Sequence, residues 1–521
     1  MTLEAALYVI EKRILINPHQ IMRPKAILTA ILCSILPGIV QAQSITVALD
    51  SFYTRIARAG QLNGNVLIAE NGKIIYQRSF GYADHGQQRL NNADTEFNLA
   101  SVSKTFTATA ILQLYEKKML KLDDTYTHYF PEFPYTTITI RQLLSHSSGL
   151  SDQDLHGIWD NVPNAASLTN QDAIGVIAAA KVTLKLRPNE KWWYSNTGYS
   201  LLAALAEKLS GEPFDQYLDR HIFKPAGMQH TYLKTKDINK INTPALSQHY
   251  DYDRMYSGAR TKLEGARGYY TNNGSGASNV ISTTGDMLRF DNALRSGRLL
   301  KETTLNTAQN YTHLRDGKPN FVWKNIGGMG HAYDGLGWFV FGDSATGKTV
   351  WHAGGMPGCA TLLLRNISRN QVVIVLDNHS SEGLYRTALA GMRILNNQPY
   401  AYPKRSLARQ YGRNLMAHGA DHAYTDLRQC LTDTAHYNVN ENDMNNLGYA
   451  LLEDNLTTQS LEVFKLNTLL YPQSDNAFNS YAEALEKAGR IQDAVSMFRY
   501  SLVINPDNED SKRSLLKLEK P

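Results

Sequence analysis

Ser101 and Lys104 stand three residues apart, a spacing that can give a serine nucleophile its own base. On a helix, side chains at positions i and i+3 share one face. The Lys104 amine would then lie beside the Ser101 hydroxyl and could take its proton, provided that burial or a neighbouring cation keeps the amine partly neutral. The same Ser-x-x-Lys pattern recurs at Ser514 and Lys517 in an expected surface helix, so the surrounding sequence has to decide.

The sequence after Ser101 predicts a helix that begins at this serine. Apolar side chains recur at helical spacing from residue 106 to residue 114, and a charged run follows at 116–118. Free backbone N–H groups and the positive end of the helix dipole would stabilise negative charge on an attacked carbonyl group. A lone serine at this position is more often a simple helix cap, so the catalytic interpretation depends on partners elsewhere in the chain.

Two later segments supply groups that such a nucleophile needs. Tyr194 and Asn196 form the first: a phenol close to an ammonium group could be held as a phenolate that moves protons, and the amide could orient a substrate acyl group. The second, residues 351–358, contains His352, Gly354 and Gly355 and precedes an apolar run. Its small residues would let the backbone of a strand approach a ligand closely.

In this order, the three motifs resemble those of serine hydrolases related to class C β-lactamases, penicillin-binding proteins and their esterase and D-aminopeptidase relatives. The similarity runs from about residue 50 to residue 395 and includes family-like stretches at 64–72, 138–150, 224–228 and 282–286. The resemblance implies an α/β fold of the β-lactamase/transpeptidase type. Helices would cover an antiparallel sheet, with the nucleophile helix at the edge of that sheet.

The resemblance also implies an acyl-enzyme mechanism for the matching residues. Ser101 would be the acylated nucleophile, Lys104 its base, and Tyr194 the group that protonates the leaving group and later activates water. The backbone N–H groups of Ser101 and Gly355 would form the oxyanion hole. By the same resemblance, the positions that bind substrate are Asn196, His352 and Gly354.

The third motif departs from the Lys-Thr-Gly of penicillin-recognising enzymes, because His352, Ala353 and Gly354 stand there. A Lys-Thr pair offers a cation and a hydroxyl to a substrate carboxylate, whereas an imidazole is mostly neutral at pH 7 and a methyl group donates nothing. We therefore expect an ester or an amide or peptide bond, without an obligatory free carboxylate, as substrate. A β-lactamase or a D-Ala-D-Ala carboxypeptidase is the alternative.

Other residues receive structural interpretations. His146 is expected to be a hydrogen-bonded structural histidine, and Trp192 serves equally well as core or as a substrate-stacking group. No metal ion or cofactor is expected, since the 15 histidines are scattered and the proposed chemistry needs no ion. Cys359 and Cys430 could pair in an oxidising compartment or stay free thiols.

Two hairpins are predicted from strand-like runs. Residues 66–69 and 73–78 flank Asn71 and Gly72, a strong hairpin turn, and residues 360–364 and 371–376 form a second antiparallel pair. Helices are expected between them. One sheet would thus be assembled from both ends of a domain that spans residues 43–398.

The N-terminal residues read as a removable leader. Residues 22–42 combine a basic start, an apolar core and a small-residue cleavage site before Gln43, so that residues 1–21 would precede the real start. Loss of this segment removes four basic and two acidic residues and takes the formal charge from +5 to +3, which argues against nucleic acid as a partner. We expect a periplasmic or secreted protein. An uncleaved anchor is less consistent with so short an apolar run.

The chain after residue 399 predicts a second module. Leu447, Gly448 and Phe464 are matched 34 positions later by Tyr481, Ala482 and Phe498, the period of tetratricopeptide helix pairs. Two repeats are expected over 441–521, with a helical linker or degenerate repeat over 399–440. Such a module could bind a protein partner, and an interaction protein with an ancillary hydrolase domain is the rival hypothesis.

Overall fold

A computed structural model describes residues 44–152, 169–180, 182–234, 243–263, 275–326, 330–342, 347–379 and 381–519. The predicted leader, residues 1–42, lies outside these ranges. The chain divides into two units, residues 1–52 and 53–521, and the first is described only over its helical residues 44–52. No helix in the described ranges combines the length and apolar character that a bilayer span requires.

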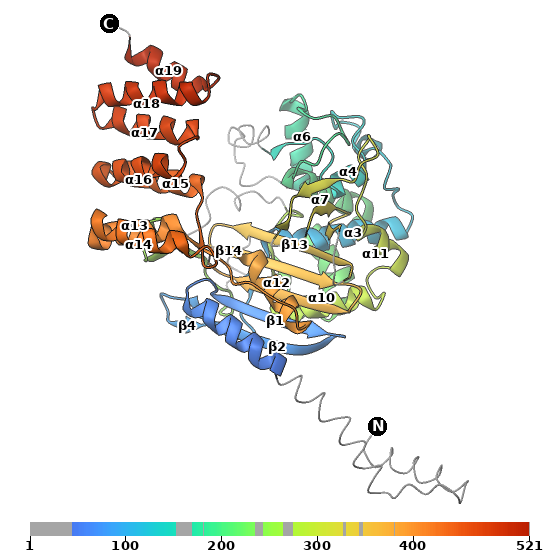
Figure 1. The fold of residues 1–521 in the computed structure, drawn as a ribbon. Coiled ribbons are helices and arrows are strands. Elements are labelled where there is room, and N and C mark those ends of the chain that lie inside the picture. Colours follow the sequence, from blue (N-terminus) through green and yellow to red (C-terminus); the bar gives the residue numbers. More distant parts are fainter. Residues whose placement is uncertain are drawn as a thin grey trace, which may run out of the picture. The chain divides into compact units, whose positions relative to one another are not determined.

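The main sheet has eight strands, each antiparallel to its neighbours, and it joins segments from both ends of the predicted domain of residues 43–398 (Figure 1). In spatial order the strands are β10 (Phe321–Trp323), β11 (Ala332–Asp334), β12 (Phe339–Phe341), β13 (Thr349–Met356), β14 (Cys359–Asn366), β15 (Gln371–Asp377), β1 (Gly64–Glu70) and β2 (Lys73–Phe80).

Both predicted hairpins are confirmed as β1–β2 and β14–β15. The turn between β1 and β2 holds Asn71 at φ 51° and Gly72 at φ 75°, which is the left-handed geometry that a tight hairpin turn needs. Strand β1 then pairs with β15, with Gly64 opposite Asp377. This pairing closes the sheet between the two ends of the domain.

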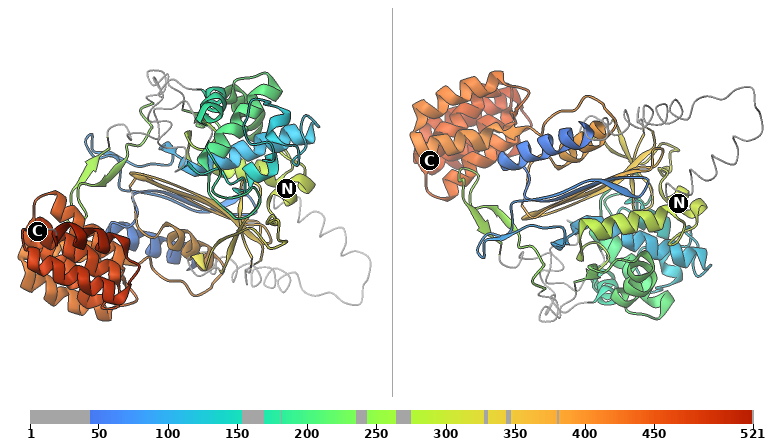
Figure 2. Two further views of the ribbon diagram at one scale, coloured as in Figure 1. Left: turned by 90° about the horizontal axis from the view of Figure 1, so that it is seen from above. Right: turned by 90° about the horizontal axis from the view of Figure 1, so that it is seen from below.

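Helices cover both faces of the sheet. Helix α10 (Thr284–Arg295) packs on β15 and β1, and α12 (Leu384–Leu395) packs on β14 and β15. Figure 2 shows these two helices on opposite faces. The central strands are therefore buried along nearly their whole length, and this explains their unbroken apolar sequences.

The remaining elements of this part of the chain connect or flank these layers. They are β3 (Tyr82–Asp84), β4 (Arg89–Leu90), β5 (Phe97–Asn98), η2 (Ala100–Ser103), α3 (Lys104–Glu116), η3 (Tyr126–His128), α4 (Ile140–Leu144), α6 (Asn170–Ala180), α7 (Asn196–Ser210), α8 (Phe214–Leu218), η5 (Asp219–Phe223), α9 (Lys224–Ala226), β6 (Tyr232–Leu233), β7 (Tyr250–Tyr252), β8 (Arg260–Lys262), β9 (Val280–Ser282) and α11 (Glu302–Ala308).

The C-terminal region is helical, as predicted, apart from two short strands, β16 (Arg405–Ser406) and β17 (Tyr437–Asn438). Its helices follow one another in stacked pairs (Figure 1). They are α13 (Leu407–His418), α14 (Ala420–Thr432), α15 (Glu441–Glu453), α16 (Thr457–Leu470), α17 (Asp475–Lys487), α18 (Ile491–Ile504) and α19 (Glu509–Leu518). The domain boundaries and the tetratricopeptide assignment stay predictions.

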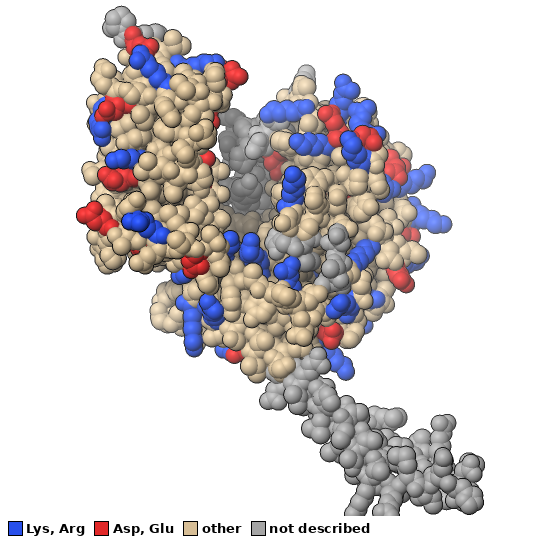
Figure 3. Space-filling view, in the orientation of Figure 1, with Lys and Arg blue, Asp and Glu red and all other residues tan. Residues whose placement is uncertain are grey.

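Basic and acidic side chains are interspersed on the face of the molecule drawn in Figure 3. This mixture agrees with the small formal charge of +5. The charge pattern therefore points to no single charged ligand class on this face.

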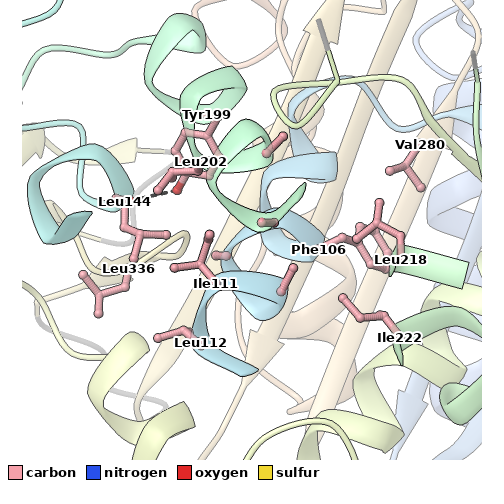
Figure 4. Close-up of a cluster of buried hydrophobic side chains, with 14 of the residues drawn as sticks. Phe106, Ile111, Leu112, Leu144, Tyr199, Leu202, Leu218, Ile222, Val280 and Leu336 are labelled. Atoms are coloured by element: carbon pink, nitrogen blue, oxygen red, sulfur yellow. Dashed lines mark hydrogen bonds between the residues drawn. The ribbon is translucent and has the colours of Figure 1, made fainter. Parts of the chain in front are cut away.

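A large apolar cluster includes Leu99 and Val102, which flank the predicted nucleophile along the chain, and Figure 4 shows part of it. Helix α3 is buried from Lys104 through Leu112, although this stretch includes Lys104 and three threonines as well as apolar residues. Phe106 and Ile111 of α3 pack in the same cluster as Leu202 of α7. This packing gives Ser101 a rigid support.

Candidate active site

Ser101 lies in the short 3-10 turn η2, directly before α3, rather than within the α-helix itself. The preceding Ala100 has φ 47°, an uncommon left-handed conformation for a residue with a side chain. The side-chain oxygen of Asn98 accepts the Ala100 N–H at 2.9 Å and holds this turn. The serine is thus presented on a strained turn, a common feature of functional sites.

The nucleophile turn packs against β13 and β14, which are central in the strand order, so the prediction that it lies at the edge of the sheet was wrong. Thr361 donates a hydrogen bond from Oγ1 to the Leu99 carbonyl oxygen at 2.7 Å. The apolar runs of β14 and β15 indicated an antiparallel pair, but no sequence signal indicated which strands the turn would meet.

Lys104 is fully buried, and its amine reaches toward the other motifs. Its Nζ lies 3.2 Å from Ser101 Oγ, 2.7 Å from Asn196 Oδ1 and 2.8 Å from the Ala277 carbonyl oxygen. Burial lowers the pKa of Lys104 to about 7, although the Asp152 carboxylate opposes this shift. The amine is therefore partly neutral near pH 7, the condition that a general base requires.

Tyr194 is hydrogen-bonded to Ser101, and its ring lies 4.8 Å from Lys104 Nζ. Burial raises the pKa of Tyr194 well above its usual range, and the hydrogen bond with Ser101 only partly offsets this. The expectation of a phenolate was wrong, because desolvation of the phenol outweighs the nearby amine. Tyr194 therefore keeps its proton at pH 7.

His352 is buried in β13, with its ring packed on Phe339 at a centroid distance of 5.0 Å. Its Nδ1 lies 2.8 Å from the Ala353 carbonyl oxygen, and since a carbonyl only accepts, Nδ1 carries the hydrogen and Nε2 is an acceptor. Burial, followed by the charge of Lys104, lowers the pKa of His352 to about 3. The third motif therefore carries no cation at neutral pH.

The two glycines of the third motif have different surroundings. Gly354 is buried against the nucleophile turn, and a Cβ built on it would lie 2.2 Å from the Leu99 carbonyl oxygen. Gly355 is exposed, and a Cβ built on it would meet nothing within 4 Å. Gly354 thus allows the strand to approach the turn, while the backbone of Gly355 is accessible.

His146 has the structural role that the sequence suggested. Its Nδ1 accepts the backbone N–H of Ser195 at 3.1 Å, and its ring packs on Tyr194 at 4.3 Å between centroids. Burial and the nearby Lys104 and His352 hold the pKa of His146 well below its usual value. His146 is therefore neutral and packs against the ring of Tyr194.

Trp192 is half-buried beside Tyr194, at 6.2 Å between ring centroids, and lies 5.5 Å from Trp323. Its Nε1 donates to the carboxyl group of the buried Asp334 at 2.8 Å. Trp192 therefore belongs, with Tyr194 and Trp323, to a group of partly exposed aromatic side chains rather than to the deep core. Trp323 was not found from the sequence, because it lies far from every motif along the chain.

Asp152 was also missed. Its carboxylate accepts hydrogen bonds from Asn196 and Thr197, and it is the charged group that acts on Lys104. It stands two residues after the stretch 138–150, and this position was the one sequence signal that could have found it.

Within the described residues, no group of three or more His, Cys, Asp or Glu side chains could hold a metal ion. His418 and His422 stand at a His-x-x-x-His spacing, and their ring centroids lie 4.7 Å apart. Cys359 and Cys430 are both buried free thiols, and this settles the alternative left open above.

The model of one family, Beta-lactamase, matches residues 51–393. The chain belongs to this family. Penicillin-binding protein 4* of Bacillus subtilis (strain 168) is 33% identical over 68% of this chain and 77% of its own length. Esterase EstB of Burkholderia gladioli is 26% identical over 66% of this chain and 93% of its own length.

A solved structure of D-amino acid amidase from Ochrobactrum anthropi SV3, in complex with L-phenylalanine amide, has the same fold. Its TM-score is 0.53, its sequence identity 22%, and the match covers 68% of this chain and 99% of that chain. This Beta-lactamase family member is accordingly a serine hydrolase.

Proposed function

We propose that the protein is an exported hydrolase that cleaves an ester or an amide or peptide bond through an acyl-enzyme on Ser101. One observation carries the proposal: the buried amine of Lys104, with a pKa of about 7, lies 3.2 Å from Ser101 Oγ. An amine of this kind can accept the serine proton without a metal ion.

In the acylation step, neutral Lys104 takes the proton of Ser101, and Oγ forms a bond to the substrate carbonyl carbon. The backbone N–H groups of Ser101 and Gly355 stabilise the oxyanion. As the bond to the leaving group breaks, Tyr194 gives its proton to the departing oxygen or nitrogen and regains one from the Lys104 ammonium. The neutral phenol found for Tyr194 supports this donor role.

In the deacylation step, water attacks the acyl carbon and its proton passes through Tyr194 to Lys104. The ammonium then returns a proton to Ser101 Oγ as the acyl bond breaks. Asn196 orients the acyl group, while His352 and Gly354 belong to the strand beside it.

The substrate class follows from the third motif. A neutral His352 with a bare Nε2 can accept a hydrogen bond but cannot form an ion pair with a carboxylate. We therefore place an ester or an amide or peptide bond without an obligatory carboxylate first. The esterase and amidase relatives support this choice.

A β-lactam or a D-Ala-D-Ala peptide is the second candidate, and the 33% identity to a penicillin-binding protein supports it. The test is the ratio of initial hydrolysis rates for p-nitrophenyl butyrate and a chromogenic cephalosporin, each corrected by Ser101→Ala. A ratio that favours the ester supports the proposal. Preference for the cephalosporin supports the second candidate, and no hydrolysis of either substrate favours the interaction-protein hypothesis.

Export and a protein partner of the C-terminal helices complete the proposal. N-terminal sequencing of the mature protein from the periplasmic or culture fraction should begin at Gln43. The close approach of Gly448 to Phe464, the small and large positions of the 34-residue period, supports helix pairs of the tetratricopeptide kind, and such a module could bind a protein partner.

A further inference from the structure

We propose that Asp152 is a positioning residue that directs the lone pair of the Lys104 base toward Ser101 by fixing the orientation of Asn196. This inference rests on the proposed function. Asp152 itself does not touch the nucleophile, and its carboxylate lies at the N-terminus of helix α7 (Asn196–Ser210).

The Asp152 carboxylate makes a dense set of hydrogen bonds. Its Oδ2 accepts the backbone N–H of Asn196 at 2.7 Å and the side-chain Nδ2 of Asn196 at 2.9 Å. Its Oδ1 accepts the backbone N–H and the Oγ1 hydroxyl of Thr197, both at 2.9 Å, and the Ser195 hydroxyl at 3.3 Å. Helix capping explains the backbone contacts but not the bond to the Asn196 amide.

That bond determines which way the Asn196 amide faces. A carboxylate only accepts hydrogen bonds, so it selects the Nδ2 end of the amide and turns Oδ1 the other way. Asn196 Oδ1 then meets Lys104 Nζ at 2.7 Å. An amide turned end for end would place Oδ1 against the Asp152 carboxylate, where neither oxygen can donate, and its N–H bonds against Lys104.

The Asn196 orientation in turn orients the base. A neutral amine has two N–H bonds and one lone pair, and two acceptors, Asn196 Oδ1 at 2.7 Å and the Ala277 carbonyl oxygen at 2.8 Å, engage the N–H bonds. The lone pair is left for the hydroxyl of Ser101, whose Oγ lies 3.2 Å away. Proton transfer depends on this direction.

Asp152 also acts through its charge. The titratable groups around Lys104 in the described structure are Asp152, the phenols Tyr194 and Tyr199, and the imidazoles His146 and His352. The phenols and imidazoles are neutral at pH 7, because burial raises the pKa values of the phenols and lowers those of the imidazoles. The Asp152 carboxylate is the charge that stabilises the ammonium form.

The test is the pH dependence of p-nitrophenyl butyrate hydrolysis by Asp152→Asn, with each rate divided by the burst amplitude of p-nitrophenol so that only acylatable sites are counted. We expect kcat/KM per site to fall by about 10²-fold. The acidic limb of the profile should move to lower pH by roughly one unit, because the ammonium loses its counter-charge.

The matched control is Asp172→Asn. Asp172 also lies at a helix N-terminus, in the first turn of α6 (Asn170–Ala180), where it accepts the Thr169 N–H and hydroxyl, each at 2.7 Å. Its loss should leave both the rate per site and the acidic limb unchanged. A residue that only caps α7 would behave likewise, so an unchanged limb or rate in Asp152→Asn overturns the inference.

If Asp152→Asn fails to fold, Asp152→Glu is the variant that tests the inference. It keeps the charge but moves the carboxylate by one methylene, so the rate per site should fall while the acidic limb stays in place, and an unchanged rate overturns the inference. Absence of Ser101-dependent hydrolysis in the unmodified protein would overturn the proposed function and this inference with it. Full activity of Asp152→Asn overturns this inference alone.

Discussion

Gly354 lies directly against Leu99: a Cβ built on the glycine would fall 2.2 Å from the Leu99 carbonyl oxygen and 2.9 Å from the Ala100 Cβ. The same carbonyl oxygen accepts the hydroxyl of Thr361 at 2.7 Å. The strand β13 and the nucleophile turn are therefore in contact through their backbones. Any side chain at residue 354 has to push the strand away from Leu99 and Ala100, the two residues directly before Ser101.

We expect Gly354→Ala to lower the free energy of unfolding by about 2 kcal/mol, because the added methyl group overpacks a backbone contact. Hydrolysis per folded molecule should fall as well, since the turn that carries Ser101 moves. Urea unfolding and the burst amplitude with p-nitrophenyl butyrate measure these effects. Gly355→Ala is the stability control, because open space surrounds Gly355, and equal stability losses in both variants would contradict the argument.

The activity should rise with pH through about 7, where Lys104 loses its proton. Burial lowers the pKa of this amine, so the active neutral form accumulates above that pH and is lost below it. Lys104→Met should remove about 10²- to 10⁴-fold of kcat/KM. A profile of kcat/KM against pH shows whether the activity rises or falls through this range. Lys517→Met, in the second Ser-x-x-Lys pattern, should leave kcat/KM unchanged at every pH. A profile of kcat/KM that does not vary with pH would exclude Lys104 as the base.

Tyr194→Phe should slow amide hydrolysis more than the acylation step of ester hydrolysis. A departing amine needs a proton, which the neutral phenol supplies, whereas p-nitrophenolate leaves without one. We expect acylation by an anilide to fall by about 10²-fold or more and acylation by the p-nitrophenyl ester to fall less. Stopped-flow burst rates measure acylation alone. Equal losses with both substrates would argue against proton donation by Tyr194.

His352→Lys tests the basis of substrate choice. The imidazole is neutral because burial lowers its pKa to about 3, and a lysine would restore the ammonium of penicillin-recognising enzymes. Because charge-assisted hydrogen bonds are about twice as strong as neutral ones, kcat/KM for a cephalosporin should rise about 10-fold relative to the ester. The cephalosporin methyl ester, which lacks the carboxylate, is the matched control, and an equal gain there would rule out carboxylate recognition.

The hairpins and the contact between Ser101 and Lys104 were predictable because each depends on local sequence, whereas the fold and the roles of the motif residues were implied by the family resemblance. Apolar runs without alternation indicated the buried strands β14 and β15, and Asn71 with Gly72 indicated the β1–β2 turn. The spacing of Ser101 and Lys104 anticipated their contact, which the structure gives as 3.2 Å.

Properties that depend on tertiary packing could not be predicted in this way. The protonation of Tyr194 follows from how deeply it is buried, and spacing along the chain carries no information on burial. Asp152 reaches Asn196 across 44 residues, with no spacing rule to connect them. The central position of the nucleophile turn likewise follows from strand order, which the hairpins alone did not determine.

The C-terminal helices offer a test of their own packing. Gly448 lies in helix α15, where a Cβ would fall 2.6 Å from the ring of Phe464 in α16. Gly448→Ala gains about 1 kcal/mol of helix propensity, but overpacking costs about 1–3 kcal/mol, so we expect a net loss of stability. Gly175→Ala in helix α6, where nothing lies within 4 Å, should instead stabilise the protein. Thermal unfolding of both variants measures the difference. A stabilised Gly448→Ala would mean that the two helices do not pack as closely as the small-large pattern of the repeat requires.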